Sequence, residues 1–221
     1  MKKIPLFLSL FLTLMLVPSV SAQKEKKKKK NIFKELFGVS VDEKTNKFEG
    51  TTTYQMYGNR VNSKLSSNNA VGNLIFGINT PTYNTFLNLE KHIPKDGEYE
   101  LAILLKVEAK NEVTVDIKEG ESLILLLDDE RINLNTEGAF NSDFDVSNST
   151  SVVNTRYAIS KEQLEKINGS DTVEFRIILD SFRSGNAKER DKEDLYLDGE
   201  FKKKNKKAWV EFYDDYLKDK A

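Results

Sequence analysis

The chain has no cysteine and only one histidine, His92. The first absence excludes disulfides, thiolate nucleophiles, cysteine-ligated metal sites and a lipid anchor on a cysteine. The second excludes histidine-rich metal sites, and a Ser-His-Asp triad would have to use His92. Because His92 stands just before Pro94 and no G-x-S-x-G motif accompanies it, we expect it on a solvent-exposed loop. We expect no cofactor.

The N-terminal apolar run is too short to span a membrane. Residues 6–17 form about 12 mostly apolar positions, whereas a spanning helix needs roughly 20. Lys2 and Lys3 precede the run, and Val20-Ser21-Ala22 presents the small residues of a signal-peptidase site. Residues 1–22 are therefore predicted to be a signal peptide cleaved after Ala22, and the protein is predicted to be periplasmic or secreted.

Positive charge is concentrated directly after this segment. Residues 24–30 contain six lysines and one glutamate, whereas the chain from residue 31 onward carries a net charge of −8. By the positive-inside rule such a cluster hinders translocation, but the short apolar run and the cleavage site together favour export. We expect residues 23–30 to be a disordered basic arm, with peripheral membrane contact through Lys24–Lys30 as an alternative. An acidic body argues against a nucleic-acid partner.

Residues 31–183 read as one all-β domain. About nine short runs of β-branched and aromatic residues are separated by Gly, Asn and Asp, and helices do not alternate with them. This pattern predicts a single β-sandwich, and the nearest alternative is a lipocalin-like barrel, because strand count does not separate the two. The predicted strands are Phe48–Tyr57, Val71–Ile78, Thr85–Leu89, Tyr99–Ala109, Val113–Ile117, Ser122–Leu127, Arg131–Leu134, Val152–Ile159 and Thr172–Leu179. Within Tyr99–Ala109 both parities are apolar, which indicates a central strand covered on both faces.

Two helices are predicted beside the strands. Ser160 followed by Gln163 is a capping-box pattern that predicts a short inserted helix ending at Asn168-Gly169. Residues 184–221 are predicted to be a charged linker, mostly loop as far as residue 207, followed by an amphipathic helix over about Asn205–Lys218.

The C-terminal helix presents one apolar face. Its five members are spaced at offsets 0, 3, 4, 7 and 8: Trp209, Phe212, Tyr213, Tyr216 and Leu217. The lysines at 202–207 and the aspartates near the end oppose the helix dipole, so the apolar face must stabilise this helix. We expect the face to dock on the β-domain, and otherwise to be an interaction surface for a partner or a membrane.

Evidence for a metal site is weak. Asn141, Asp143 and Asp145 place oxygen atoms at alternate positions, like the first half of an EF-hand loop. Val146 and Val152 stand where that loop needs glycine and glutamate, so a polar loop is the preferred interpretation and calcium the alternative.

Evidence for glycan binding or for hydrolysis by paired carboxylates is also weak. Tyr54, Tyr57 and Tyr83 could stack on sugars, but tyrosines in strands are more often half-buried. With 35 acidic residues some pair will always be close, and Asp128-Asp129-Glu130 is better explained as a hairpin turn.

Our interpretation is an exported, non-catalytic binding or structural protein of the bacterial cell envelope, whose partner is an envelope protein or a glycan. The alternative is a glycan- or lipid-acting hydrolase that uses paired carboxylates. The signal peptide and the strand-rich, lysine-heavy body resemble, in a general way, small exported proteins of Gram-negative bacteria. That resemblance covers no specific motif and implies no site residues.

Overall fold

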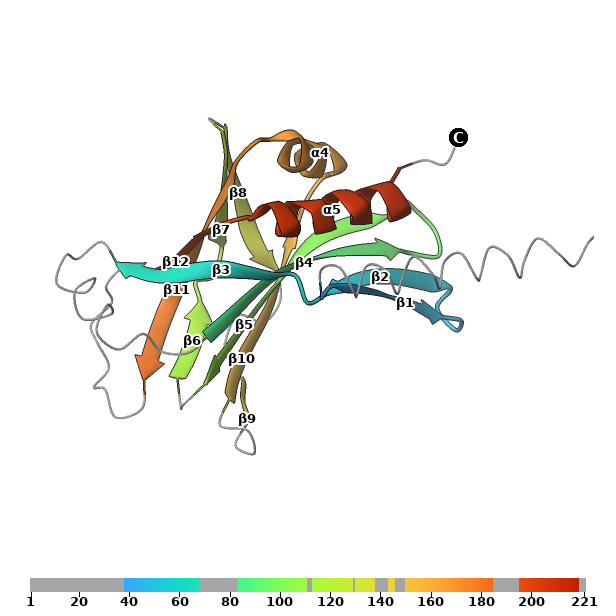
Figure 1. Ribbon diagram of the computed structural model, residues 1–221. Helices are drawn as coiled ribbons and strands as arrows, with labels where there is room; N and C mark the ends of the chain where they lie inside the picture. The colour runs from blue at the N-terminus through green and yellow to red at the C-terminus, as the bar shows by residue number, and fades with distance from the viewer. Residues whose placement is uncertain are drawn as a thin grey trace, which may run out of the picture.

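The fold is predominantly β, as the sequence predicts (Figure 1). The computed structural model describes residues 38–67, 83–110, 113–128, 130–137, 143–145, 150–184 and 195–218. These residues form twelve strands and two helices: β1 (Ser40–Asn46), β2 (Thr51–Tyr57), β3 (Arg60–Ser67), β4 (Tyr83–Ile93), β5 (Glu100–Lys110), β6 (Val113–Ile117), β7 (Glu121–Leu127), β8 (Glu130–Glu137), β9 (Asp143–Asp145), β10 (Thr150–Ala158), α4 (Lys161–Gly169), β11 (Val173–Ser184), β12 (Leu195–Glu200) and α5 (Lys203–Tyr216).

Eight antiparallel strands close into a barrel in the order β4-β3-β12-β11-β7-β8-β10-β5, and β5 pairs with β4. The β4–β5 and β5–β10 walls are long ladders. Two corners are short: β3 meets β4 only at Arg60↔Phe86 and Val61↔Thr85, and β8 meets β10 only near Tyr157. The predicted sandwich is therefore not confirmed. The barrel closes through these brief ladders, which strand count cannot reveal.

A hairpin extends the sheet beyond the barrel wall. β4 pairs through its first half with β3 and through its second half with β2, and β2 pairs with the edge strand β1. The chain passes from β2 to β3 through Gly58, which has φ 84°. A Cβ atom at Gly58 would clash with the carbonyl oxygen of Gly38, so this connection requires glycine.

The barrel interior is filled by apolar side chains, most of them from the β-strands. β5 is buried along Leu101, Ile103 and Leu105; on its other parity Ala102 is buried but Leu104 is only partly buried, so the predicted coverage of both faces holds only at the start of the strand. Tyr157 of β10 is buried, and its hydroxyl hydrogen-bonds Ser122 at 3.0 Å. The exclusion of water from these side chains is the main stabilising term in a chain without disulfides.

The sequence analysis missed four strands: β1, β3, β9 and β12. β12 lies in the segment that we predicted to be mostly loop, so that prediction is wrong for Leu195–Glu200. Hydrogen bonds to β3 on one edge and to β11 on the other hold this short strand. Residues 71–78, predicted to be a strand, lie outside the described part of the chain.

Both helices form where the sequence predicts them. α4 begins with the predicted capping box: Ser160 Oγ accepts from Gln163 N at 3.1 Å, and Ser160 N donates to Gln163 Oε1 at 2.9 Å. α5 lies across the barrel near β4 (Figure 1). Within the described chain, no helix combines the length and the apolar character needed to cross a bilayer.

Candidate functional site

The predicted interaction face of α5 is packed against the barrel. Trp209 and Phe212 are 0% exposed and Leu217 is 3% exposed. Tyr213 and Tyr216 are partly buried; the Tyr213 hydroxyl donates to Glu165 of α4, and burial raises the pKa of Tyr216 to about 12. The docking that we expected is confirmed, and this face is not a free surface for a partner.

Three asparagines that the sequence analysis did not single out fix α5 in place. Asn205 Nδ2 donates to Asn59 Oδ1 and to the Arg60 carbonyl, both at 2.8 Å. Asn59 in turn donates through its backbone N–H to Asn88 Oδ1 at 3.1 Å. All three asparagines are buried. Each hydrogen bond therefore satisfies a polar group whose burial without a partner would cost free energy of folding. This cluster has a structural role. The only signal of it in the sequence is the position of Asn205 at the predicted start of the C-terminal helix.

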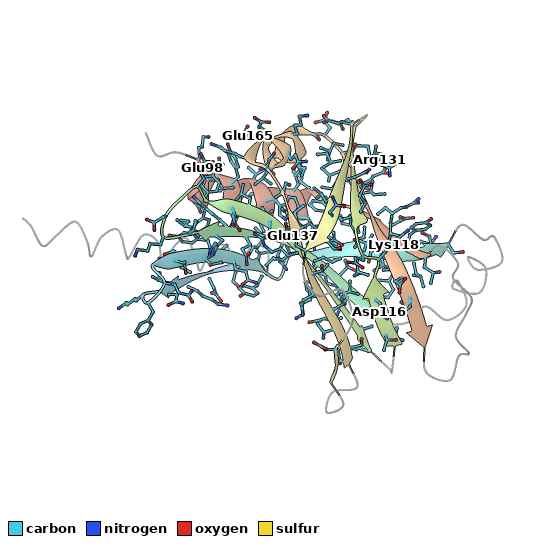
Figure 2. The ribbon with its side chains drawn as sticks, turned by 180° about the vertical axis from the view of Figure 1, so that it is seen from behind. Glu98, Asp116, Lys118, Arg131, Glu137 and Glu165 are labelled. Carbon is cyan, nitrogen blue, oxygen red and sulfur yellow. The ribbon has the colours of Figure 1, made fainter. Side chains whose placement is uncertain are left out.

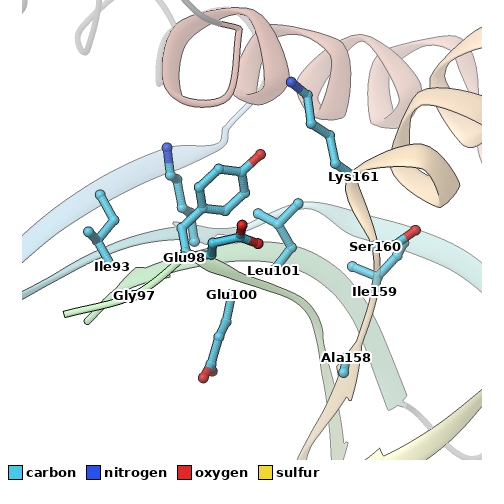
Figure 3. Close-up of a pocket in the computed structure, with 11 residues that line it drawn as sticks. Ile93, Gly97, Glu98, Glu100, Leu101, Ala158, Ile159, Ser160 and Lys161 are labelled. Atoms are coloured by element: carbon cyan, nitrogen blue, oxygen red, sulfur yellow. The ribbon is translucent and has the colours of Figure 1, made fainter. Parts of the chain in front are cut away.

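A cleft of about 820 Å³ opens beside α5, at the end of the barrel (Figure 3). One wall is the end of β4, the following connection and the start of β5; the other is the end of β10 and the start of α4. Figure 2 shows Glu98 of this cleft at the same end of the molecule as Glu165 of α4, and Asp116 at the opposite end. The lining residues are Lys91, Ile93, Gly97, Glu98, Tyr99, Glu100, Leu101, Ala158, Ile159, Ser160 and Lys161. Its volume falls within the range of small-molecule sites.

The cleft has a mainly apolar lining and one fixed cation. Lys91 Nζ donates to the carbonyl oxygen of Tyr216 at 2.7 Å and lies 4.3 Å from the centre of the Tyr99 ring. Its ammonium therefore serves two roles, as a cation at the C-terminal end of α5 and as a cation–π partner of the aromatic ring in the cleft. The backbone of Ile159 donates to the Leu101 carbonyl at 3.0 Å, which holds the two walls together.

Two opposite charges remain without partners in the cleft. Neither Glu98 nor Lys161 makes an ion pair or a side-chain hydrogen bond with another described residue. They come from different walls, and Glu100 points to the other side of the strand from both of them (Figure 3). Glu100 is instead paired with Arg156 at 3.3 Å. The two cleft carboxylates therefore do not face each other as a pair of hydrolytic acids must.

The single histidine lies on a strand, so the expected loop position is wrong. His92 is near the end of β4 and is partly buried. Its Nδ1 atom is 2.9 Å from the Thr53 hydroxyl on the neighbouring strand β2. Cross-strand pairing places both side chains on the same face of the sheet, so the bond is explained by strand register.

The weak calcium candidate gains no support. Asn141 lies outside the described residues, and Asp143 and Asp145 form the two ends of the short strand β9. In the described part of the chain, no three acidic or histidine side chains converge on a point that could hold a metal ion.

The carboxylate of Asp128 has a structural role. Asp128 has φ 49°, in the turn between β7 and β8. Its side chain accepts hydrogen bonds from the backbone N–H and the hydroxyl of Thr172, both at 2.9 Å, and from Asp171 N. These bonds, led by the one from the Thr172 backbone, lower the pKa of Asp128. The turn interpretation of this acidic stretch therefore holds for Asp128.

Comparison with known proteins identifies no relative. No protein-family model, no curated protein and no solved structure matches the chain.

Proposed function

We propose that the protein is an exported, non-catalytic binding protein of the cell envelope and that its ligand site is the cleft between the β4–β5 connection and the start of α4. The observation that carries this proposal is the pair of unpartnered charges, Glu98 and Lys161, on different walls of an apolar cleft. Glu98 is exposed and Lys161 is partly buried, so both charges are accessible to a ligand that supplies the opposite charge.

The chemistry of the cleft favours a small zwitterionic ligand with an apolar part. Glu98 would accept a ligand ammonium and Lys161 would donate to a ligand carboxylate. Leu101 and Ile159, already buried at the base of the cleft, would pack against the apolar part. Tyr99 adds an aromatic ring beside them.

The barrel is lipocalin-like in having eight strands, but we place the ligand at its end. Ile103, Leu105, Leu123 and Ile177 are fully or almost fully buried in the interior, so the described side chains fill the space that a lipocalin ligand would use. The hydrolase alternative has no facing carboxylate pair in the cleft to support it.

The test is calorimetric titration of the mature chain with leucyl-leucine, octanoate and octylamine. We expect leucyl-leucine to bind, and both Glu98→Gln and Lys161→Gln to weaken binding by about tenfold, as loss of one charged hydrogen bond predicts. Glu162→Gln and Lys118→Gln, exposed positions that do not line the cleft, are the matched controls and should bind normally. Failure of all three compounds to bind would contradict the proposal.

We also propose that export removes residues 1–22. The support is the small-residue site that ends at Ala22. Mass spectrometry of the protein purified from its native host should then find an N-terminus at Gln23, and an intact Met1 would contradict export.

A further inference from the structure

We propose that the exposed lysines at the start of α5 form a binding surface for anionic lipid headgroups. We call Lys202, Lys203 and Lys204 the lysine cluster. All three are exposed, and none makes an ion pair with another described residue. The next two lysines differ: Lys206 lies close enough to Asp128 to help lower its pKa, and Lys207 pairs with Glu211 at 3.8 Å.

The fold holds the cluster outward. Asn205, Trp209 and Phe212 define the buried side of α5 and lie one or two turns apart. At 3.6 residues per turn, Lys203 and Lys204 project from other sides of the helix than Asn205 does. The hydrogen bonds of Asn205 to Asn59 and Arg60 fix the rotation of α5 about its axis. The backbone that carries the three lysines is therefore held in place.

The cluster has a cost that folding alone does not explain. Cations in the first turn of a helix oppose the macrodipole, and α5 has no acidic residue in that turn. Like charges on adjacent residues also repel. Anionic groups bound to the cluster would offset both the unfavourable helix dipole and the repulsion between the lysines.

The rest of the chain favours a lipid surface as the source of that charge. The chain from residue 31 onward is acidic overall and is repelled by an anionic bilayer, so the cluster has to act at short range, within about one screening length of the headgroups. The basic run at residues 24–30 is a second cation source on the same chain, and each lysine near an anionic bilayer gains about 1 kcal/mol. Two such clusters on one chain reinforce each other by effective concentration. The cleft lies at the opposite end of α5, where Lys91 meets Tyr216, so this surface is independent of the proposed ligand site.

The test is co-sedimentation of the mature chain, with its basic arm, with two kinds of vesicle: equimolar phosphatidylglycerol and phosphatidylcholine, or phosphatidylcholine alone. We expect binding to the anionic vesicles only. The triple variant Lys202→Gln/Lys203→Gln/Lys204→Gln should bind at least about tenfold more weakly. The control triple Lys95→Gln/Lys110→Gln/Lys118→Gln removes the same charge from dispersed exposed positions and should weaken binding by less than about threefold.

Thermal unfolding distinguishes a lipid surface from a structural role. Because the cluster opposes the helix dipole, its triple variant should melt at the same temperature as the parent or higher. If it melts lower, the double variant Lys203→Gln/Lys204→Gln is compared with Lys95→Gln/Lys118→Gln in its place. Equal weakening by cluster and control variants, no binding to anionic vesicles, or cluster-dependent binding to a soluble polyanion such as heparin but not to vesicles would overturn the proposal.

Discussion

The two helices of this protein are stabilised in opposite ways. α4 has a complete capping box, Glu162 in its first turn and Lys166 in its last turn, and it buries only Leu164 and Ile167. α5 has lysines at its start and no basic residue in its last turn. Its own ends therefore disfavour it, and the barrel stabilises it instead.

Contacts with residues far from α5 in the sequence stabilise this helix. Trp209 is buried, donates from Nε1 to the Leu87 carbonyl at 3.1 Å, and packs edge-on against Phe201 at 4.8 Å between ring centres. Lys91 of β4 supplies the missing cation at the C-terminal end. Local end effects are worth about 1 kcal/mol each, whereas a buried aromatic residue is worth several, so packing decides for α5.

The largest expected effect is at Trp209. Trp209→Ala should lower the free energy of unfolding by about 3–5 kcal/mol, because it leaves a cavity and removes one of the two hydrogen-bond donors to the Leu87 carbonyl, the other being Asn59 Nδ2. Urea denaturation followed by circular dichroism measures this. Phe48→Ala is the control, since Phe48 is fully exposed and should change little. A loss below about 1 kcal/mol would mean that docking does not hold α5.

Asn205→Ala should cost about 1–3 kcal/mol in the same assay. The change leaves Asn59 Oδ1 and the Arg60 carbonyl without their donor in a buried region. The exposed Asn135 on β8 provides the matched control, Asn135→Ala, which should be nearly neutral. Equal effects of the two variants would show that the buried asparagine cluster is not what positions α5.

Ser160→Ala tests the self-stabilised helix and should cost about 1 kcal/mol. Ser160→Asp keeps an oxygen that can accept from Gln163 N and should restore most of the stability. If alanine and aspartate behave alike, the cap does not stabilise α4.

Lys204→Glu, unlike the preceding substitutions, should raise the stability of the protein. An acidic residue in the first turn of α5 interacts favourably with the helix dipole, so stability should rise by about 0.3–1 kcal/mol at low ionic strength. The gain should shrink in about 1 M salt, where the screening length is short. A loss of stability would mean that the first turn of α5 is not disfavoured by its lysines.

The smallest effect concerns Asp128, which fixes the segment after α4. The folded-state pKa of this carboxyl lies below its ordinary value of 3.8. The ionised form therefore stabilises the fold above that value, and this stabilisation is lost as the pH falls through the folded-state pKa. Asp128→Asn should melt lower than the parent at pH 7, and the difference should begin to shrink near pH 3.8 and vanish only below the folded-state pKa. A constant difference down to pH 2 would contradict the role of the charge.

Much of the fold could be predicted from the sequence because the signals are local. The alternation in β5 and the continuous apolar run in β7 reflect burial that each strand carries in its own residues. Ser160 and Gln163 lie three positions apart, so their hydrogen bonds close within one turn. The five apolar residues of α5 share one face by helical periodicity alone.

The candidate site could not be predicted because it depends on separated segments. Glu98 and Lys161 are both ordinary charged residues in the sequence, and only barrel closure brings the β4–β5 connection beside the start of α4. The same holds for Lys91 and Tyr216, which are 125 positions apart.

The sequence by itself determined the all-β class, the capped helix and the amphipathic helix, since propensity and periodicity act over a few residues. The tertiary structure alone decided between sandwich and barrel, because closure depends on two corners where single short ladders form. It also decided that Leu195–Glu200 becomes the strand β12, because its stability comes from hydrogen bonds to two neighbouring strands.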